Sequence, residues 1–130
     1  MKFKSQICTT REQSERLLAL GLKRETADMV WTHAYYSTWV ATAKENPLYF
    51  HEADEDTIPA WSLHRLIEMM PRFVEWESGA WLYVSHDDVL YTDLNYVTKD
   101  FSCWGEIYNN VISAIEWLIK EGYFPKEYLV

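Results

Sequence analysis

Cysteine, glycine and proline are scarce in this chain of 130 residues, which holds two Cys, four Gly and four Pro. Secreted scaffolds of this size usually carry more cysteines, so Cys8 and Cys103 predict two reduced thiols. The alternative is a bridge between them. The glycines stand apart, without the spacing of a phosphate-binding loop, and the cysteines and scattered histidines form no zinc pattern. We therefore expect no cofactor.

Long apolar runs and positive charge are also in short supply. No run approaches the roughly 20 residues that a membrane-spanning helix needs, and the first residues lack the apolar stretch of a signal peptide. Residues 51–130 hold five Lys and Arg against fifteen Asp and Glu, whereas residues 1–50 hold seven against five. Such an acidic surface repels phosphates and anionic lipids. We expect a cytoplasmic protein with no direct nucleic-acid binding and no membrane attachment.

Apolar and aromatic residues, by contrast, are plentiful, at 48% and 16% of the chain, with seven Trp and nine Tyr. Large rings bury more area per residue than aliphatic side chains, so the chain can build a sizeable core. It contains no internal repeat and no linker-like segment. Domains commonly run to roughly 100–150 residues, so the sequence predicts a single domain over residues 1–130.

A helix is predicted over residues 10–20. Thr10 can accept the backbone N–H of Gln13, whose amide can reach back to Thr10, and this reciprocal arrangement is a capping box. Gly21 stands where a left-handed residue commonly ends a helix. A shorter helical turn is expected at residues 24–29, because acidic residues early in it suit the positive end of the helix dipole.

The middle of the chain is harder to interpret. Residues 34–40 favour a strand through their aromatic and β-branched content, although residues 39–45 would also suit a short helix. Residues 51–56 carry too much like charge for a core and are interpreted as a solvated loop. Beyond them, Ser62 is a good helix N-cap, and apolar residues recur at the spacing of one helix face until Pro71. A second helix is therefore expected.

An aromatic-rich sheet and a closing helix complete the predicted fold. Alternation would place Trp81 and Tyr83 on one face of their strand. The last helix has a wide apolar stripe and must pack on another element or subunit. The fold class is therefore α+β: a small antiparallel sheet of three to four strands packed against an internal helix and a C-terminal helix, with an N-terminal helix. Three strands are expected at residues 73–76, 80–85 and 89–92, a fourth would lie near 101–104, and the closing helix is expected at 107–121.

Several segments resemble known proteins. Residues 8–13, 17–22 and 25–29 resemble a recurrent opening of small proteins from phages, prophages and gut-bacterial mobile elements, and Pro59–Leu63 and Ala114–Lys120 resemble two further signatures of them. The order of helix, aromatic strands and closing helix is also similar to the phage ABA-sandwich domain. The resemblance implies an α+β fold and a mobile-element setting. It implies no activity, because none is established for either group.

Three local clusters suggest chemistry, and each has a simpler explanation. The carboxylates of residues 51–56 lack the ligand spacing of a calcium loop. His86 beside Asp87 resembles a base oriented by a carboxylate, yet a hairpin tip is too exposed to retune its pKa. Cys103 would need a nearby histidine to act as a nucleophile, and a small buried cysteine is commoner. We therefore predict no catalytic residue and no metal ligand.

The aromatic residues are numerous enough to leave some on the surface, where Trp and Tyr dominate binding hot spots. Stacking on single-stranded nucleic acid is disfavoured, since such sites normally lie in basic grooves. Six aromatic residues make up the candidate interaction surface: Tyr35, Tyr36, Trp39, Trp76, Trp81 and Tyr83.

Three functions follow as hypotheses. The first, which we favour, is a non-enzymatic protein-interaction module of a phage or mobile element that binds an unknown protein partner or associates with itself. The second is an acidic mimic of DNA that inhibits a nucleic-acid enzyme, because ordered carboxylates can imitate phosphates. The third is a small enzyme whose catalytic residues converge only in space.

Overall fold

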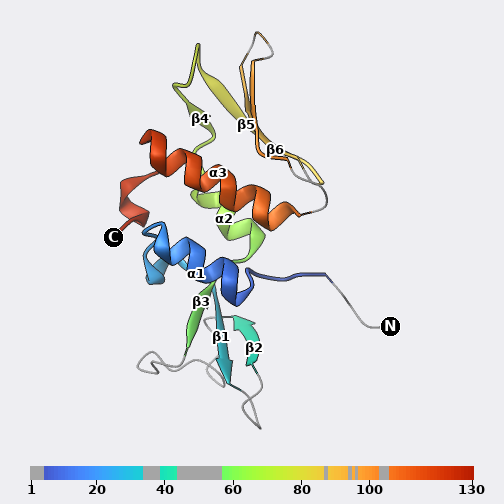
Figure 1. Ribbon diagram of the computed structural model, residues 1–130, viewed down its shortest axis with the longest axis vertical. Helices are drawn as coiled ribbons and strands as arrows, with labels where there is room; N and C mark the ends of the chain where they lie inside the picture. Colours follow the sequence, from blue (N-terminus) through green and yellow to red (C-terminus); the bar gives the residue numbers. More distant parts are fainter. Residues whose placement is uncertain are drawn as a thin grey trace. The chain divides into compact units, whose positions relative to one another are not determined.

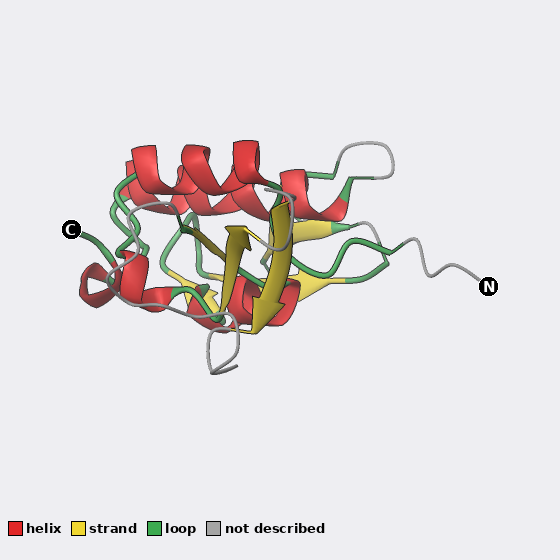
Figure 2. Cartoon of the chain, turned by 90° about the horizontal axis from the view of Figure 1, so that it is seen from below, coloured by secondary structure: helices red, strands yellow, loops and turns green. Residues whose placement is uncertain are grey.

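The computed structural model describes residues 5–33, 39–43, 57–86, 88–93, 95, 97–102 and 106–130 (Figure 1). The chain forms two compact units: a first unit, Met1–Leu66 with Tyr128–Val130, and a second unit, Ile67–Glu127. Both combine helices with antiparallel strands (Figure 2), so the predicted α+β class is confirmed. The boundary between the units falls inside the second helix.

The elements follow one another in this order. The first unit contains α1 (Arg11–Ala19), the 3₁₀ helix η1 (Arg24–Thr26), β1 (Met29–His33), β2 (Trp39–Ala43) and β3 (Ile58–Ala60), and α2 (Leu63–Met69) spans the boundary. The second unit contains β4 (Phe73–Val74), β5 (Ala80–Val84), β6 (Val89–Thr92), β7 (Thr98–Asp100) and α3 (Ile107–Glu121), after which comes the 3₁₀ helix η3 (Lys126–Tyr128).

The helix α1 begins and ends as the sequence predicts. Thr10 Oγ1 accepts the N–H of Gln13 at 3.2 Å, and Gln13 Oε1 accepts the N–H of Thr10 at 3.0 Å, which completes the capping box. Gly21, with a φ of 103°, then turns the chain. The N–H of Leu22 donates to the carbonyl of Leu17 at 3.2 Å, as in a helix closed by a left-handed glycine.

The first unit holds a three-stranded antiparallel sheet in the order β2-β1-β3 (Figure 1). The sequence predicts only one sheet, in the second half of the chain, so this additional sheet is a correction. Residues 39–43 form a strand, so the short helix considered at 39–45 is wrong. The strand considered at 34–40 overlaps β2 only at residues 39–40, and its residues 34–38 lie outside the described residues. Ile58–Ala60, expected to lead into α2, pair with β1. Pro59 is compatible with β3 because this strand lies at the edge of the sheet. The helical turn predicted at 24–29 forms only as η1, whereas the strand that the sequence also allows at residues 29–31 is confirmed by β1.

The core of the first unit is organised around Trp61, which is fully buried. Its backbone N–H donates to Thr9 Oγ1 at 3.1 Å, and its carbonyl accepts the N–H of Thr9 at 2.9 Å. Its indole Nε1 donates to Thr26 Oγ1 at 2.9 Å, and Thr9 Oγ1 lies 2.7 Å from Ser14 Oγ. Among the described residues, no buried side-chain nitrogen or oxygen lacks a hydrogen-bond partner. The burial of these polar groups is therefore fully compensated.

The second unit holds a four-stranded antiparallel sheet in the order β4-β5-β6-β7. The strand β6 has the predicted bounds, and β5 is one residue shorter than predicted. The fourth strand is Thr98–Asp100 rather than residues near 101–104. Phe101 still continues the ladder for one bond, since its N–H donates to the carbonyl of Val89 at 2.9 Å.

The helix α3 covers one face of this sheet, where it contacts β6 (Figure 1). Its bounds are those predicted, and Gly122, with a φ of 80°, ends it. Trp117 on α3 gathers several rings with centroid distances of 5.6–6.0 Å: those of Trp76, Tyr91, Phe101 and Tyr123. The predicted core stripe of α3 is fully buried: Val111, Ala114, Ile115 and Leu118.

Candidate functional site

Strand alternation divides the side chains of the four-stranded sheet between two faces. On the face toward α3, Val89 and Tyr91 are fully buried. On the other face, Phe73, Trp81 and Tyr83 are 43%, 55% and 53% exposed. We call this second side the aromatic face. By strand register its positions are Phe73, Trp81, Tyr83, Leu90, Thr92, Thr98 and Asp100.

Backbone pairing holds the rings of the aromatic face in place. Phe73 and Trp81 are cross-strand partners, and their ring centroids lie 5.0 Å apart at an interplanar angle of 58°. The Phe73 ring also covers Gly79, where an added Cβ would come within 2.7 Å of its Cζ. Gly79 has a φ of 98°, which also favours glycine at this turn. The surface is therefore built on paired strands and not on a loose loop.

Trp81 and Tyr83 present a regular spacing. They stand two residues apart on β5, and both point to the aromatic face. Because an antiparallel strand rises about 3.4 Å per residue, their attachment points are about 7 Å apart. Tyr83 pairs with Leu90, which pairs with Asp100, so this carboxylate lies two strands away, at about 10 Å.

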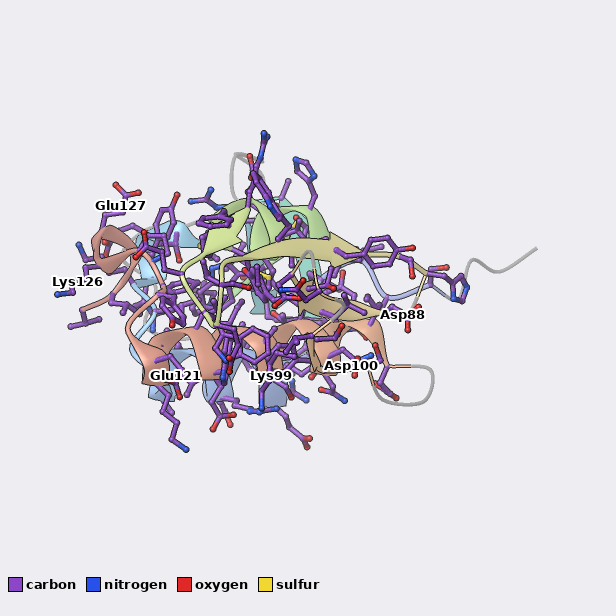
Figure 3. The ribbon with its side chains drawn as sticks, turned by 90° about the horizontal axis from the view of Figure 1, so that it is seen from above. Asp88, Lys99, Asp100, Glu121, Lys126 and Glu127 are labelled. Carbon is purple, nitrogen blue, oxygen red and sulfur yellow. The ribbon has the colours of Figure 1, made fainter. Side chains whose placement is uncertain are left out.

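The aromatic face is acidic rather than basic. Among its positions, Asp100 is the charged residue, and hydrogen bonds from the side chain and backbone of Ser102 lower the pKa of its carboxyl. In Figure 3, Asp88 and Asp100 lie at the opposite end of the second unit from Lys126 and Glu127. The second unit as a whole has four Lys and Arg against eleven Asp and Glu, whereas the first has eight against nine.

The structure describes four of the six predicted surface residues. Of them, Trp81 and Tyr83 share the aromatic face. Trp76 is half-buried and meets Trp117 edge-on at 6.0 Å. In the first unit, the half-buried Trp39 lies under the guanidinium of Arg11, 5.0 Å from its ring centroid. The remaining two predicted residues, Tyr35 and Tyr36, lie outside the described residues.

Sequence reasoning missed Phe73 and Leu90 as members of the aromatic face. Both contribute through register: Phe73 faces Trp81, and Leu90 faces Tyr83. The alternation of β5 was visible in the sequence, but which residues of β4 and β6 stand beside it depends on where each turn begins and ends.

A polar cluster in the first unit resembles a chemical site but has the hydrogen bonds of a helix cap. Ser62 Oγ donates to Asp28 Oδ2 at 2.5 Å, and Ser62 N–H donates to Asp28 Oδ1 at 2.8 Å. Ser62 Oγ in turn accepts the N–H of Arg65 at 3.2 Å. Arg65 Nε donates to the carbonyl of Thr26 at 2.8 Å. These bonds fix the start of α2 against the turn before β1.

Cys8 is a free thiol that is 2% exposed. Burial, with a smaller contribution from the Asp28 carboxylate, raises the pKa of this thiol to about 11. Because the thiolate is the nucleophilic form, Cys8 is expected to be unreactive at neutral pH. The other sequence candidates, Asp87, Cys103 and residues 51–56, lie outside the described residues.

Other features of the described surface point to no chemistry. A groove of the first unit is lined by Thr10, Arg11, Glu12, Glu15 and Ile58, and the guanidinium in this lining already lies over Trp39. Within the described ranges, no three His, Cys, Asp or Glu side chains come together in a way that would hold a metal ion. The described helices include none with the length and apolar character to cross a membrane.

Comparison of the chain with known proteins finds no matching family model, no matching curated protein and no matching solved structure. Function is therefore inferred from the surface itself.

Proposed function

We propose that this chain is a non-enzymatic protein-interaction module that binds a partner protein through the aromatic face of its four-stranded sheet. The observation that carries the proposal is the exposure of Trp81 and Tyr83 beside Phe73 on one side of one sheet. Contiguous apolar surface commonly marks an interaction site, and Trp and Tyr are the residues most enriched at binding hot spots. The phage or mobile-element setting that the resemblance implies is part of this proposal.

The aromatic face is suited to binding because its rings need little ordering. Strand pairing fixes the backbone of β5 on both sides, between β4 and β6. Trp and Tyr have only two side-chain torsions to immobilise, so they lose less conformational entropy on binding than long flexible side chains do. A larger share of the free energy from burying their exposed area therefore contributes to affinity than for long flexible side chains.

The occupant that we propose is a different protein and not a second copy of this chain. The second unit has an excess of seven acidic residues, from eleven against four. Two such units brought together through the same face would place like charge against like charge. A partner with a complementary surface avoids this repulsion.

The aromatic face argues against a DNA mimic, and the polar groups of the first unit argue against an enzyme. A DNA mimic requires a row of carboxylates, but the outward strand positions hold aromatic and small polar side chains, with Asp100 at the edge. An enzyme requires polar groups free to react. The Ser62–Asp28 cluster is instead committed to the start of α2, and Cys8 is protonated at neutral pH.

The proposal is tested by isolating a partner from a bacterial extract and titrating it, after purification, with matched variants. We expect the double variant Trp81→Ser and Tyr83→Ser to raise the dissociation constant at least about tenfold, because each ring removed is a central contact. The control is Ile7→Ser, which removes an apolar side chain of similar exposure, 53%, from the first unit. Circular dichroism verifies that both variants are folded. Equal affinity of the wild type and the double variant would refute the proposal.

A further inference from the structure

We infer that the aromatic face takes an extended, basic segment of its partner, with Arg or Lys side chains at alternate positions lying over the rings of Trp81 and Tyr83. This inference rests on the proposed function and adds the chemistry of the partner to it. Three observations support it: the ring spacing, the charge around the rings, and the use of the same contact elsewhere in the chain.

The spacing of the two rings matches that of an extended peptide. Trp81 and Tyr83 stand two residues apart on β5 and point the same way. In an extended segment, side chains two residues apart also point the same way and repeat at about 7 Å. A partner segment lying along β5 therefore brings one side chain over each ring. Both of these side chains come from alternate positions of the partner segment.

The charge around the rings favours cations at those positions. A cation over the face of Trp or Tyr is attracted by the negative face of the ring. Asp100, about 10 Å from Tyr83 across two strands, adds a carboxylate whose lowered pKa keeps it ionised at neutral pH. This distance is about one Debye length at 0.1 M salt, so the attraction is partly screened and its contribution is modest. The outward positions of the four strands include no Lys and no Arg to oppose it.

Elsewhere in the chain, Lys and Arg side chains lie over aromatic rings in cation–π contacts. The guanidinium of Arg11 lies 5.0 Å from the ring centroid of Trp39, and that of Arg65 lies 5.6 Å from Tyr128. In the second unit, Lys99 Nζ lies 5.9 Å from the ring of Phe101. Within the described part of the chain, no Lys or Arg is placed over Trp81 or Tyr83 in this way. Trp81 and Tyr83 are 55% and 53% exposed, so part of each ring can be reached by the cations of another molecule.

The experiment titrates the full chain, labelled with nitrogen-15, with two synthetic octapeptides. One alternates Arg with Ala, and the other replaces each Arg by citrulline, which keeps the shape and loses the charge. We expect the Arg peptide to shift the indole N–H signal of Trp81 saturably and to bind about tenfold more tightly than the citrulline peptide, as two exposed cation–π contacts would give. Added salt should weaken binding of the Arg peptide.

Two matched charge variants test whether the Arg peptide is attracted by the aromatic face or by the net charge of the protein. Asp100→Asn should weaken binding of the Arg peptide about two- to threefold, as expected for an exposed charge. Glu127→Gln removes the same charge at the other end of the second unit and should leave the affinity unchanged (Figure 3). Equal weakening by both variants would overturn the inference, because the attraction would then be to the net charge.

One further outcome would overturn the inference without touching the proposed function, and a second outcome would overturn both, because the proposed occupant is a different protein. Equal binding of both peptides at Trp81 would mean that the face takes apolar or neutral segments. A dimer seen by sedimentation, and lost in Trp81→Ser, would mean that a second copy covers the face. Failure of the proposed function has a different signature, namely a purified partner that binds the wild type and the double variant equally.

Discussion

The tryptophans of the two units lie in different surroundings. In the first unit, Trp61 is fully buried with its indole bonded to Thr26, and the indole Nε1 of Trp31 donates to the carbonyl of Thr9 at 2.9 Å. In the second unit, the face toward α3 is equally closed, but the other face leaves Trp81 more than half exposed. A buried ring whose N–H is hydrogen-bonded contributes to stability. A ring exposed on a sheet can instead contact a partner.

The distribution of charge follows the same division. The first unit is close to neutral, with eight Lys and Arg against nine Asp and Glu, and the second is strongly acidic. Acidic charge around an exposed aromatic surface limits association between copies and selects partners of opposite charge. The difference between the units thus separates a structural region from the region that we propose to bind.

The largest expected effect contrasts one tryptophan from each unit. Trp61→Ala should cost about 3–5 kcal/mol of unfolding free energy, because it removes a fully buried ring, whereas Trp81→Ala should cost less than about 1 kcal/mol. Urea unfolding measures both. If Trp61→Ala does not fold, Trp61→Phe keeps most of the volume and tests the lost bond to Thr26. Similar costs at the two positions would contradict this division between the two units.

A second prediction concerns the loss of stability at high pH that the buried thiol of Cys8 in the first unit should cause. The pKa of Cys8 is about 11 in the folded chain, so the unfolded chain ionises at lower pH. The resulting stability is complete below about pH 9 and is lost as the pH rises toward 11, by about 2 kcal/mol. Urea titrations at several pH values should show this loss in the wild type and a flatter profile in Cys8→Ala. Burial also raises the pKa of Tyr91 in the second unit, well above its usual range. Parallel profiles for wild type and Cys8→Ala would disprove the assignment to Cys8.

A smaller effect is expected from the last residues of the chain, which belong to the first unit. The N–H of Lys23 donates to the carbonyl of Tyr128 at 2.8 Å, and the N–H of Val130 donates to the carbonyl of Gly21 at 2.8 Å. Deleting residues 128–130 removes both bonds and should cost about 1–2 kcal/mol. Hydrogen exchange should then accelerate at the Lys23 amide and stay unchanged in β5 and β6. Faster exchange in those strands would show that the tail also supports the second unit.

The smallest predicted effect concerns the turn that sets the register of the aromatic face. Glu77 has a backbone φ of 56°, which residues other than glycine rarely adopt. Glu77→Gly should therefore raise the unfolding free energy by up to about 1 kcal/mol, and thermal unfolding measures it. Gly79→Ala is the opposite case, because its Cβ would meet the Phe73 ring. A destabilising Glu77→Gly would contradict this explanation of the turn.

Local signals in the sequence were sufficient to predict several elements. The capping box of Thr10 and the left-handed glycines Gly21 and Gly122 mark the helix ends through bonds between near neighbours. The bounds of β6 and α3 follow from turn residues and apolar periodicity in the same way. The outward positions of Trp81 and Tyr83 depend only on alternation within β5.

Features that depend on distant pairing were not predictable. The three-stranded sheet brings residues 58–60 beside 29–31, and neither segment carries a signal for the other. Trp76 is predicted as a surface residue of a strand at 73–76, but β4 ends at Val74, and nothing in the neighbouring sequence shows that Trp117 lies against Trp76. Phe73 was missed because its position opposite Trp81 depends on the turn through Glu77 and Gly79.

The most direct test of the central claim follows the indole N–H signals of the full chain by cross-saturation from a bound partner. We expect saturation to reach Trp81 and to leave Trp61 and Trp31 unaffected, because the aromatic face of the second unit is the proposed contact surface. Saturation that reaches the tryptophans of the first unit and not Trp81 would contradict the claim.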